Sequence, residues 1–161
     1  MNKKINILRT ILIILLLGRF SIIFNFSNQD GVKSGSLSRE ITEEVTKHVN
    51  SIQTLEKVEK ERVLNKIEHY IRKLAHFSLY LVLGMITNSL MCTFNLKNNR
   101  RIYISLGIGI IYAVSDEFHQ IFIPDRTASI LDILIDSCGV AVGIFLVFFI
   151  VKIHERIFQK K

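Results

Sequence analysis

The sequence predicts an all-α membrane protein with four transmembrane helices and an amphipathic helical segment on the outer side, between the first and the second. The chain has 161 residues, which is room for one domain, so residues 1–161 form a single membrane domain. Its apolar residues, 49% of the total, are gathered in long runs instead of recurring only at amphipathic spacing. A helix needs about 20 apolar residues to cross the hydrocarbon layer, and residues 5–26, 74–94, 102–123 and 130–153 meet this requirement.

The first run follows the basic start "MNKK" and has two interpretations. A secretory signal peptide also begins with basic residues and continues with an apolar stretch. However, no small-x-small cleavage site follows, and Arg19 lies inside the run. The run therefore indicates a membrane anchor that is retained.

The segment after the first run combines a connector with helical periodicity. "FSNQDGVKSGSLS" is rich in glycine and serine and predicts a connector. Over residues 36–72, apolar residues recur at helical spacing between charged ones, with Ser38 and Thr54 as predicted N-caps. This outer segment is either a pair of amphipathic helices on the outer leaflet or over the top of the bundle, or a lid over a site.

Lys and Arg residues predict the orientation of the spans. Three short flanks contain them: Lys3, Lys4 and Arg9; Lys97, Arg100 and Arg101; and Lys152, Arg156, Lys160 and Lys161. With four spans, all three flanks lie on one side, and the positive-inside rule places them in the cytoplasm. The sequence thus predicts a multi-pass protein of the cell membrane with cytoplasmic N- and C-termini. This segregation explains the net charge of +7 without a nucleic-acid partner.

The polar residues of the spans are concentrated in the predicted outer third. They are Arg19 in the first span, Arg72, Lys73, His76 and Tyr80 around the start of the second, Asp116, Glu117 and His119 near the end of the third, Arg126 in the following link, and Asp132 and Asp136 in the fourth. Because charges are costly within a bilayer, such a concentration predicts a shared cavity.

A purely structural role for these charges is the alternative. Arg19 could pair with Asp136, and Arg126 with Asp132 or Glu117, to lock the helices together. Small residues already provide close packing without such pairs, notably the small-x-x-x-small face of Gly139 and Gly143. This favours a functional cavity.

Three kinds of chemistry fit the polar residues. Asp116 and His119, with His76 and Asp132 or Asp136, could bind a divalent metal through nitrogen and oxygen. His119 or His76 could act as a general base or nucleophile beside a carboxylate. Arginine and lysine side chains could hold a phosphate or pyrophosphate, assisted by the amino end of the fourth span. The last two are compatible and describe a pocket for a phospholipid or lipid-linked head group.

Four sequence stretches resemble the VanZ-like family of bacterial membrane proteins. They are "FSNQDG", "RKLAHFSLYLVLG", "YAVSDEFHQIFIPDR" and "DILIDSCGVAVG", in the family's order and spacing. The resemblance implies a four-span envelope protein whose namesake is associated with reduced susceptibility to the glycopeptide teicoplanin. Ser78 and Asp125 depart from the pattern, because many relatives carry Glu and Gly there.

Together, the residues and the resemblance predict an outward-facing polar pocket for an envelope lipid or a lipid-linked cell-wall precursor, with a lipophilic glycopeptide as a further ligand. The predicted ligand-binding residues are Arg19, Ser27, Gln29, Arg72, Lys73, Tyr80, Gln120, Arg126, Asp132 and Asp136. The alternative is a hydrolase or transferase acting on a lipid phosphate, with His119, Asp116, His76 and Glu117 as catalytic residues. Transport is disfavoured because the cytoplasmic halves of the spans contain no acidic residue and no histidine.

Overall fold

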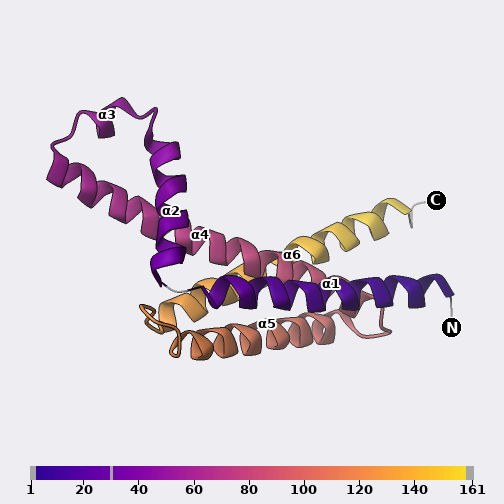
Figure 1. Cartoon of the computed structure of the whole chain (residues 1–161). Coiled ribbons are helices and arrows are strands. Elements are labelled where there is room, and N and C mark those ends of the chain that lie inside the picture. The colour runs from indigo at the N-terminus through magenta and orange to yellow at the C-terminus, as the bar shows by residue number, and fades with distance from the viewer. Residues whose placement is uncertain (1–2, 30, 159–161) are drawn as a thin grey trace.

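The structure is a computed structural model that describes residues 3–29 and 31–158. Within these ranges every regular element is a helix, which confirms the all-α prediction. In chain order the helices are α1 (Lys3–Ser27), α2 (Gly31–Thr46), α3 (Asn50–Gln53), α4 (Lys57–Cys92), α5 (Asn98–Gln120) and α6 (Ile130–Phe158). The four long helices α1, α4, α5 and α6 form a bundle, and α2 and α3 project from it with the first half of α4 (Figure 1).

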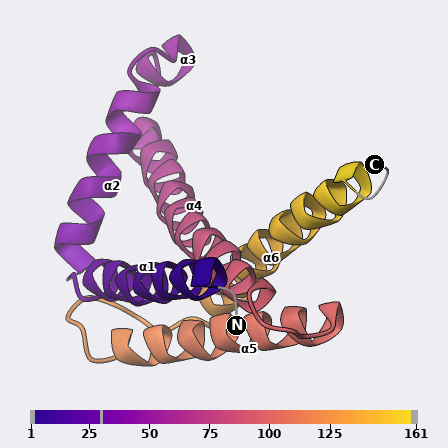
Figure 2. The same ribbon diagram turned by 90° about the vertical axis from the view of Figure 1, so that its right-hand side faces the viewer.

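Successive bundle helices alternate in direction. The amino end of α1, the link from α4 to α5 and the carboxyl end of α6 lie at the same end of the bundle (Figures 1 and 2), here called the basic end after Lys97, Arg100 and Arg101. There Arg9 donates from Nη2 to the carbonyl oxygen of Thr93 at 2.8 Å. The opposite end, where α5 ends and α6 begins, is called the cavity end.

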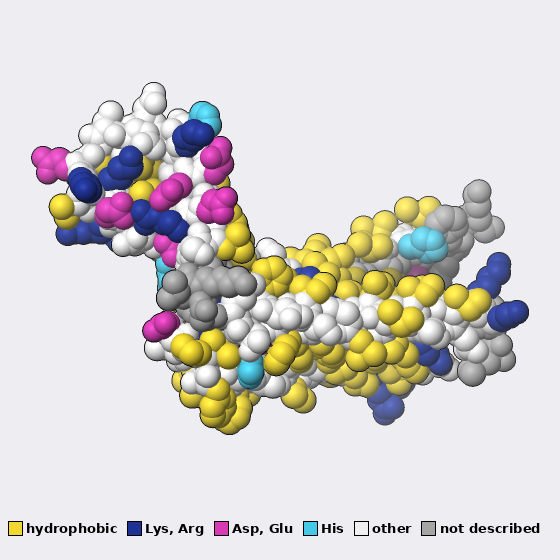
Figure 3. Space-filling model, in the orientation of Figure 1, with side chains coloured by type: hydrophobic (Ala, Val, Ile, Leu, Met, Phe, Trp, Pro, Cys, Tyr) yellow, Lys and Arg dark blue, Asp and Glu magenta, His cyan; other side chains and the backbone are white. Residues whose placement is uncertain are grey.

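Three of the helices are long and apolar enough to cross a membrane: α1, α4 and α6. Helix α5 is not among them, since it begins with Asn98, Asn99, Arg100 and Arg101 and ends with polar residues that include Asp116, Glu117 and His119. Of the four predicted spans, three thus correspond to candidate membrane-spanning helices by length and composition. Figure 3 shows hydrophobic side chains along the bundle and charged side chains gathered on the projecting helices.

Helix α4 corrects the predicted boundary between the outer segment and the second span. Residues 36–72 and 74–94 were expected as separate units, but α4 runs without interruption for 36 residues. The reason is local: between Lys57 and Gly84 the chain contains neither glycine nor proline, so nothing ends the helix.

The start of the outer segment also differs from prediction. Helix α2 begins at Gly31, so most of the predicted connector is helical. Ser38 lies inside α2, where its hydroxyl donates to the Gly35 carbonyl at 3.1 Å, and Thr54 is the C-cap of α3. Both predicted N-caps are wrong, since local hydrogen bonding also suits serine and threonine at interior and carboxyl-terminal positions.

Helix α4 is central, because it contacts every other helix. Its closest approach is to α6, through Gly139 and Gly143. A Cβ atom on Gly139 would lie 2.5 Å from the Phe77 carbonyl oxygen, and one on Gly143 would lie 2.0 Å from that of Leu81. The predicted small-residue face thus allows direct backbone contact between the two helices.

The hairpin of α2 and α4 is joined by polar groups. Arg39 on α2 donates to Glu61 at 2.7 Å and to Asn65 at 2.8 Å, both on α4. Thr42 and Thr46 are buried, whereas Leu37, Ile41 and Val45 are exposed. Helix α2 therefore leaves an apolar face uncovered by the hairpin.

Candidate functional site

A polar cavity of about 390 Å³ lies at the cavity end, between α4, the end of α5, the link to α6 and the start of α6. Eight residues predicted for the site line it: Arg72, Lys73, His76, Glu117, Gln120, Arg126, Asp132 and Asp136. The structure thus brings together residues from three helices that are distant in the sequence.

The start of α6 is fixed by two carboxylates of the cavity. Glu117 Oε1 accepts a hydrogen bond from the backbone nitrogen of Ser129 at 2.5 Å, just before α6 begins. A carboxylate at this position satisfies a free amide and complements the positive helix end. Asp132 in the first turn of α6 pairs with Lys73 of α4. These contacts hold the mouth of the cavity in place.

Behind the cavity, Asp116 is held by hydrogen bonds from two helices. The Ser27 hydroxyl at the end of α1 donates to Asp116 Oδ2 at 2.7 Å. Gln120 donates from Nε2 to the same carboxylate oxygen at 3.2 Å and to the Ser27 hydroxyl at 3.0 Å. All three residues are buried. The Asp116 carboxylate is therefore oriented by the protein alone.

His76 and Asp136 face each other across the α4/α6 contact. His76 Nδ1 lies 3.8 Å from Asp136 Oδ2. Tyr80, which is fully buried, places its hydroxyl near the carboxylates of Asp116 and Asp136. His76, Asp116 and Asp136 also offer ligand atoms that all lie within 4.8 Å of one another, so these residues could hold a metal ion.

An apolar groove of about 350 Å³ adjoins the polar cavity, between α1, α2 and α4. The predicted residues Arg19 and Gln29 line this groove instead of the polar cavity, together with Leu37 and Ile41 of the exposed α2 face. Arg19 donates from Nη2 to the Leu79 carbonyl oxygen at 2.6 Å. Arg72 and His76 line both spaces, so the cavity and the groove share one wall.

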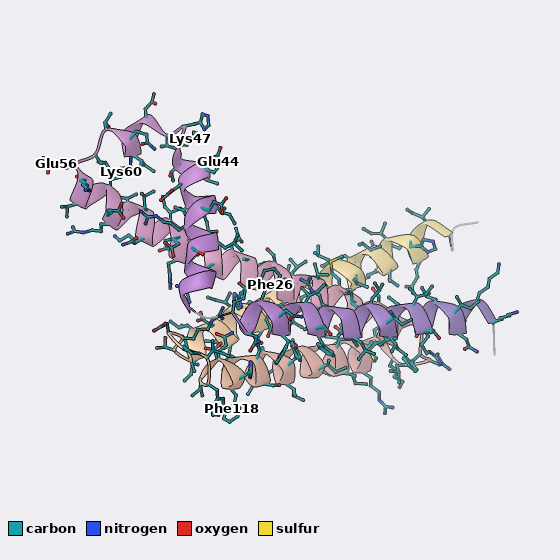
Figure 4. All side chains as sticks on the ribbon, viewed as in Figure 1. Phe26, Glu44, Lys47, Glu56, Lys60 and Phe118 are labelled. Atoms are coloured by element: carbon teal, nitrogen blue, oxygen red, sulfur yellow. The ribbon has the colours of Figure 1, made fainter. Side chains whose placement is uncertain are left out.

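His119 does not reach the cavity. Its ring stacks on Phe24 of α1 with centroids 4.8 Å apart, and its Nε2 lies 3.4 Å from Asn28 Oδ1. Its neighbour Phe118 projects away from the bundle (Figure 4) and is 63% exposed. Of the two histidines predicted as catalytic, His76 is the one in the cavity wall.

Several cavity residues were missed by the sequence reasoning. The polar ones are His69, Asp125, Thr127 and Ser129, and the apolar ones are Leu131 and Ile135. His69 precedes Lys73 by one helical turn and therefore shares its face, a signal that a continuous α4 would have supplied. Asp125 has a positive φ of 58°, the conformation that favours glycine, which fits the glycine expected at this position from the resemblance.

The arrangement offers a ligand both signs of charge. Guanidinium groups of Arg72 and Arg126 can donate to phosphate oxygens, and the Arg126 group is anchored by a hydrogen bond to the Phe26 carbonyl at 3.2 Å. The Asp125 and Asp132 carboxylates can accept from ammonium or hydroxyl groups of the same ligand. The cavity is therefore suited to a polar head group that combines an anion with hydrogen-bond donors.

The profile of the VanZ/LLP1 family matches residues 11–152. Searches among curated proteins and among solved structures find no match. The matched range includes α4 and α5 completely, most of α1 and α6, the polar cavity and the apolar groove. On this match the chain belongs to the VanZ/LLP1 family.

Proposed function

We propose that the chain is a multi-pass protein of the cell membrane in which α5 crosses the bilayer beside α1, α4 and α6. Helix α5 packs against all three of these helices. The basic end would face the cytoplasm, because its short flanks hold Lys97, Arg100 and Arg101. The cavity end then faces outward, with the hairpin of α2 and α4 above the outer leaflet.

We further propose that the protein binds an envelope lipid or a lipid-linked cell-wall precursor, with the head group in the polar cavity and the hydrocarbon chain in the apolar groove. The observation that carries this proposal is the shared wall: Arg72 and His76 line both spaces. A ligand that fills both must be amphiphilic, polar at one end and apolar at the other.

The charges of the shared wall favour a phosphate in the head group. Lys73 is paired with Asp132, whereas Arg72 lines both the cavity and the groove. Arginine presents a planar fork that matches two phosphate oxygens. Phosphate binding at this point would place the ester-linked chain next to the groove.

The exposed apolar face of α2 supports the chain site. Leu37 and Ile41 are 47% and 44% exposed and line the groove together with Ile71 and Val82 of α4. An apolar face left open beside a cavity is costly in water and is compatible with contact with lipid. Helix α2 would then cover the upper part of the bound chain.

Native mass spectrometry of the protein in mild detergent tests this proposal. We expect wild type to retain an anionic or zwitterionic phospholipid or prenyl phosphate, and Arg72→Gln to retain at least about tenfold less, since a charge-assisted contact to phosphate is worth about 1.5–3 kcal/mol. Arg62→Gln is the matched control, because Arg62 is exposed on the same helix and lines neither space. Equal retention by both variants would contradict the proposal.

A second variant separates a lipid from free phosphate. Ala75 lines the groove but not the polar cavity, so Ala75→Phe would fill the groove and leave the polar cavity intact. We expect it to lose long-chain lipid while still binding a short-chain analogue. Leu74→Phe is the control, since Leu74 is 64% exposed and lines neither space.

Hydrolysis or group transfer on a lipid phosphate is the second candidate function. It is favoured by the position of His76, an imidazole beside the Asp136 carboxylate at the shared wall. A histidine beside a carboxylate can act as a general base. Turnover would be supported if wild type released phosphate or an acyl group from the retained lipid and His76→Gln did not, while still binding the lipid. If wild type released no product, binding would be the function.

The family resemblance makes teicoplanin susceptibility the cellular readout for this proposal. Cells producing the wild type would be less susceptible to teicoplanin if the protein shields a lipid-linked precursor or captures the lipophilic antibiotic. We expect Arg72→Gln to remove this protection and Arg62→Gln to preserve it. Equal protection by Arg72→Gln and Arg62→Gln would mean that reduced teicoplanin susceptibility does not depend on the cavity.

A further inference from the structure

We infer that His76, Asp116 and Asp136 together bind one divalent metal cation, either Mn²⁺ or Zn²⁺. The three residues come from α4, α5 and α6, and one ligand atom of each lies within 4.8 Å of the others. Two atoms about 2.1 Å from one cation lie about 4.2 Å apart when they are on opposite sides of it and about 3.0–3.5 Å apart at neighbouring positions. The three side chains would therefore draw together by up to about 1.8 Å when a cation binds.

A buried carboxylate oxygen points to a ligand at this position. Asp136 is 2% exposed, and its Oδ1 has no hydrogen-bond partner among the described residues. An unsatisfied buried acceptor costs about 1–3 kcal/mol, more when it is charged, so such atoms are rare without a reason. The Asp116 carboxylate, 5% exposed, lies in the same cluster and adds like-charge repulsion. A divalent cation at the Asp136 carboxylate would offset this cost and neutralise the charge of both carboxylates.

The distance between His76 and Asp136 also suits a shared ion. Nδ1 and Oδ2 are 3.8 Å apart, which is too long for a hydrogen bond. Two atoms bound to one cation at about 2.1 Å in tetrahedral or octahedral geometry lie roughly 3.0–3.5 Å apart. The pair is thus already close to the spacing that a common metal ion requires.

The surrounding hydrogen bonds resemble the support that metal ligands receive. Ser27 and Gln120 both donate to Asp116 Oδ2, and this orients the carboxylate before any ligand binds. The Tyr80 hydroxyl, buried beside Asp116 and Asp136, has no hydrogen bond of ordinary geometry and could donate to a cation-bound water or a carboxylate.

The donor set determines the class of cation. One imidazole with two carboxylates suits Mn²⁺ or Zn²⁺, whereas Ca²⁺ prefers a larger set of oxygen ligands. His76 and Asp136 both line the polar cavity, so the remaining coordination positions would be open to water or to a ligand oxygen there. This inference does not depend on lipid binding.

Metal binding by the full-length protein tests the inference directly. Protein in mild detergent is stripped with a chelator and titrated with Mn²⁺ or Zn²⁺ by calorimetry, and elemental analysis follows gel filtration. We expect one cation per chain in wild type. Asp136→Asn and Asp116→Asn should each weaken binding at least about tenfold, since loss of even an outer-shell partner has effects of this size.

Asp132→Asn is the matched control. Asp132 lies on α6 four residues before Asp136 and lines the same cavity, but it pairs with Lys73 and is not in the cluster. We expect this variant to bind the cation as wild type does. Equal weakening in Asp132→Asn and Asp136→Asn would mean diffuse attraction by an acidic surface and would overturn the inference.

A spectroscopic measurement on wild type removes any dependence on how the variants fold. Electron spin-echo spectra of bound Mn²⁺ should show coupling to one imidazole nitrogen. Absence of this coupling, or absence of any stoichiometric Mn²⁺ or Zn²⁺ in wild type, would overturn the inference.

Discussion

The two halves of the α4/α6 contact are built in opposite ways. Around Gly139 and Gly143 the helices touch backbone to backbone, without intervening side chains. One and two turns earlier on α6, Asp136 and Asp132 carry carboxylates that face His76 and Lys73 of α4. Figures 1 and 2 show α4 and α6 crossing in the bundle.

This difference shows how a membrane bundle can keep charged groups together. Buried charges separate helices unless something else holds them, because their desolvation opposes association. The glycine contact supplies that hold next to the cavity. We therefore expect substitutions in the packed half to change stability most, and substitutions in the polar half to change ligand binding more than stability.

The largest effect is expected at Gly143. In Gly143→Ala the added Cβ would meet the Leu81 carbonyl oxygen at 2.0 Å, and a backbone atom cannot move aside as a side chain can. Overpacking typically costs about 1–3 kcal/mol, occasionally more, and an overlap with backbone atoms at this distance belongs at or above the upper end of that range. Unfolding in detergent followed by helical circular dichroism measures it. Gly107→Ala is the control, because nothing lies within 4 Å of a Cβ there; an equal loss in both variants would contradict the packing argument.

A smaller loss is expected at Ser27, in the polar half. Ser27→Ala removes the hydrogen bond of 2.7 Å to the buried Asp116 carboxylate. Leaving a buried charged acceptor less satisfied costs about 1–3 kcal/mol. Ser21→Ala is the matched control on α1, because the exposed Ser21 hydroxyl donates only to the Leu17 carbonyl of its own helix. If both variants unfold at the same denaturant concentration as wild type, Ser27 does not hold Asp116 as described.

The main helices could be predicted from the sequence because apolar runs and small-residue spacing are local signals. The apolar runs predicted the bounds of α1, α5 and α6 to within a few residues. The glycine pair on α6 predicted a close helix contact, which the structure shows to be with α4. The continuity of α4 could not be read in this way. A change from amphipathic to uniformly apolar composition marks where a helix enters a membrane, and it does not mark where a helix ends.

The site could be predicted in part for a similar reason. Spacing shows which residues of one helix share a face, but only packing decides which face meets the cavity. Viewed along the axis of α5, Gln120 and Glu117 lie on one side of Asp116, at about 40° and about 100° from it. His119 lies on the other side of Asp116, at about 60°. His119 accordingly stacks on Phe24 of α1, while Glu117 and Gln120 line the cavity.

Lys73 tests the expected separation of binding from stability. The side chains of Lys73 and Asp132 are 23% and 37% exposed, and partly exposed ion pairs contribute about 0.2–1 kcal/mol. Lys73→Met should therefore change unfolding by no more than this, while reducing lipid retention in the cavity several-fold. A double-mutant cycle with Asp132→Asn measures the pair. A large loss of stability with unchanged lipid retention would mean that the polar half of the α4/α6 contact serves stability and not ligand binding.

The smallest effect is expected in the projecting hairpin. Arg39 is hydrogen-bonded to Glu43 at 2.8 Å, Glu61 at 2.7 Å and Asn65 at 2.8 Å. The side chains of Glu43 and Glu61 are 60% and 54% exposed, and the less exposed Glu68 carboxylate is farther away, at 3.9 Å. Since exposed pairs contribute little, Arg39→Gln should lower stability by at most about 1 kcal/mol.

The location of this effect matters more than its size. Amide hydrogen exchange should rise along α2 in Arg39→Gln and stay unchanged around Gly139 and Gly143, because Arg39 ties α2 only to the part of α4 outside the bundle. The exposed Arg62 on α4 provides the control variant Arg62→Gln. Faster exchange in the glycine contact as well would mean that the unbroken α4 transmits hairpin opening into the bundle, so that α2 could not move over the groove independently of the packed half.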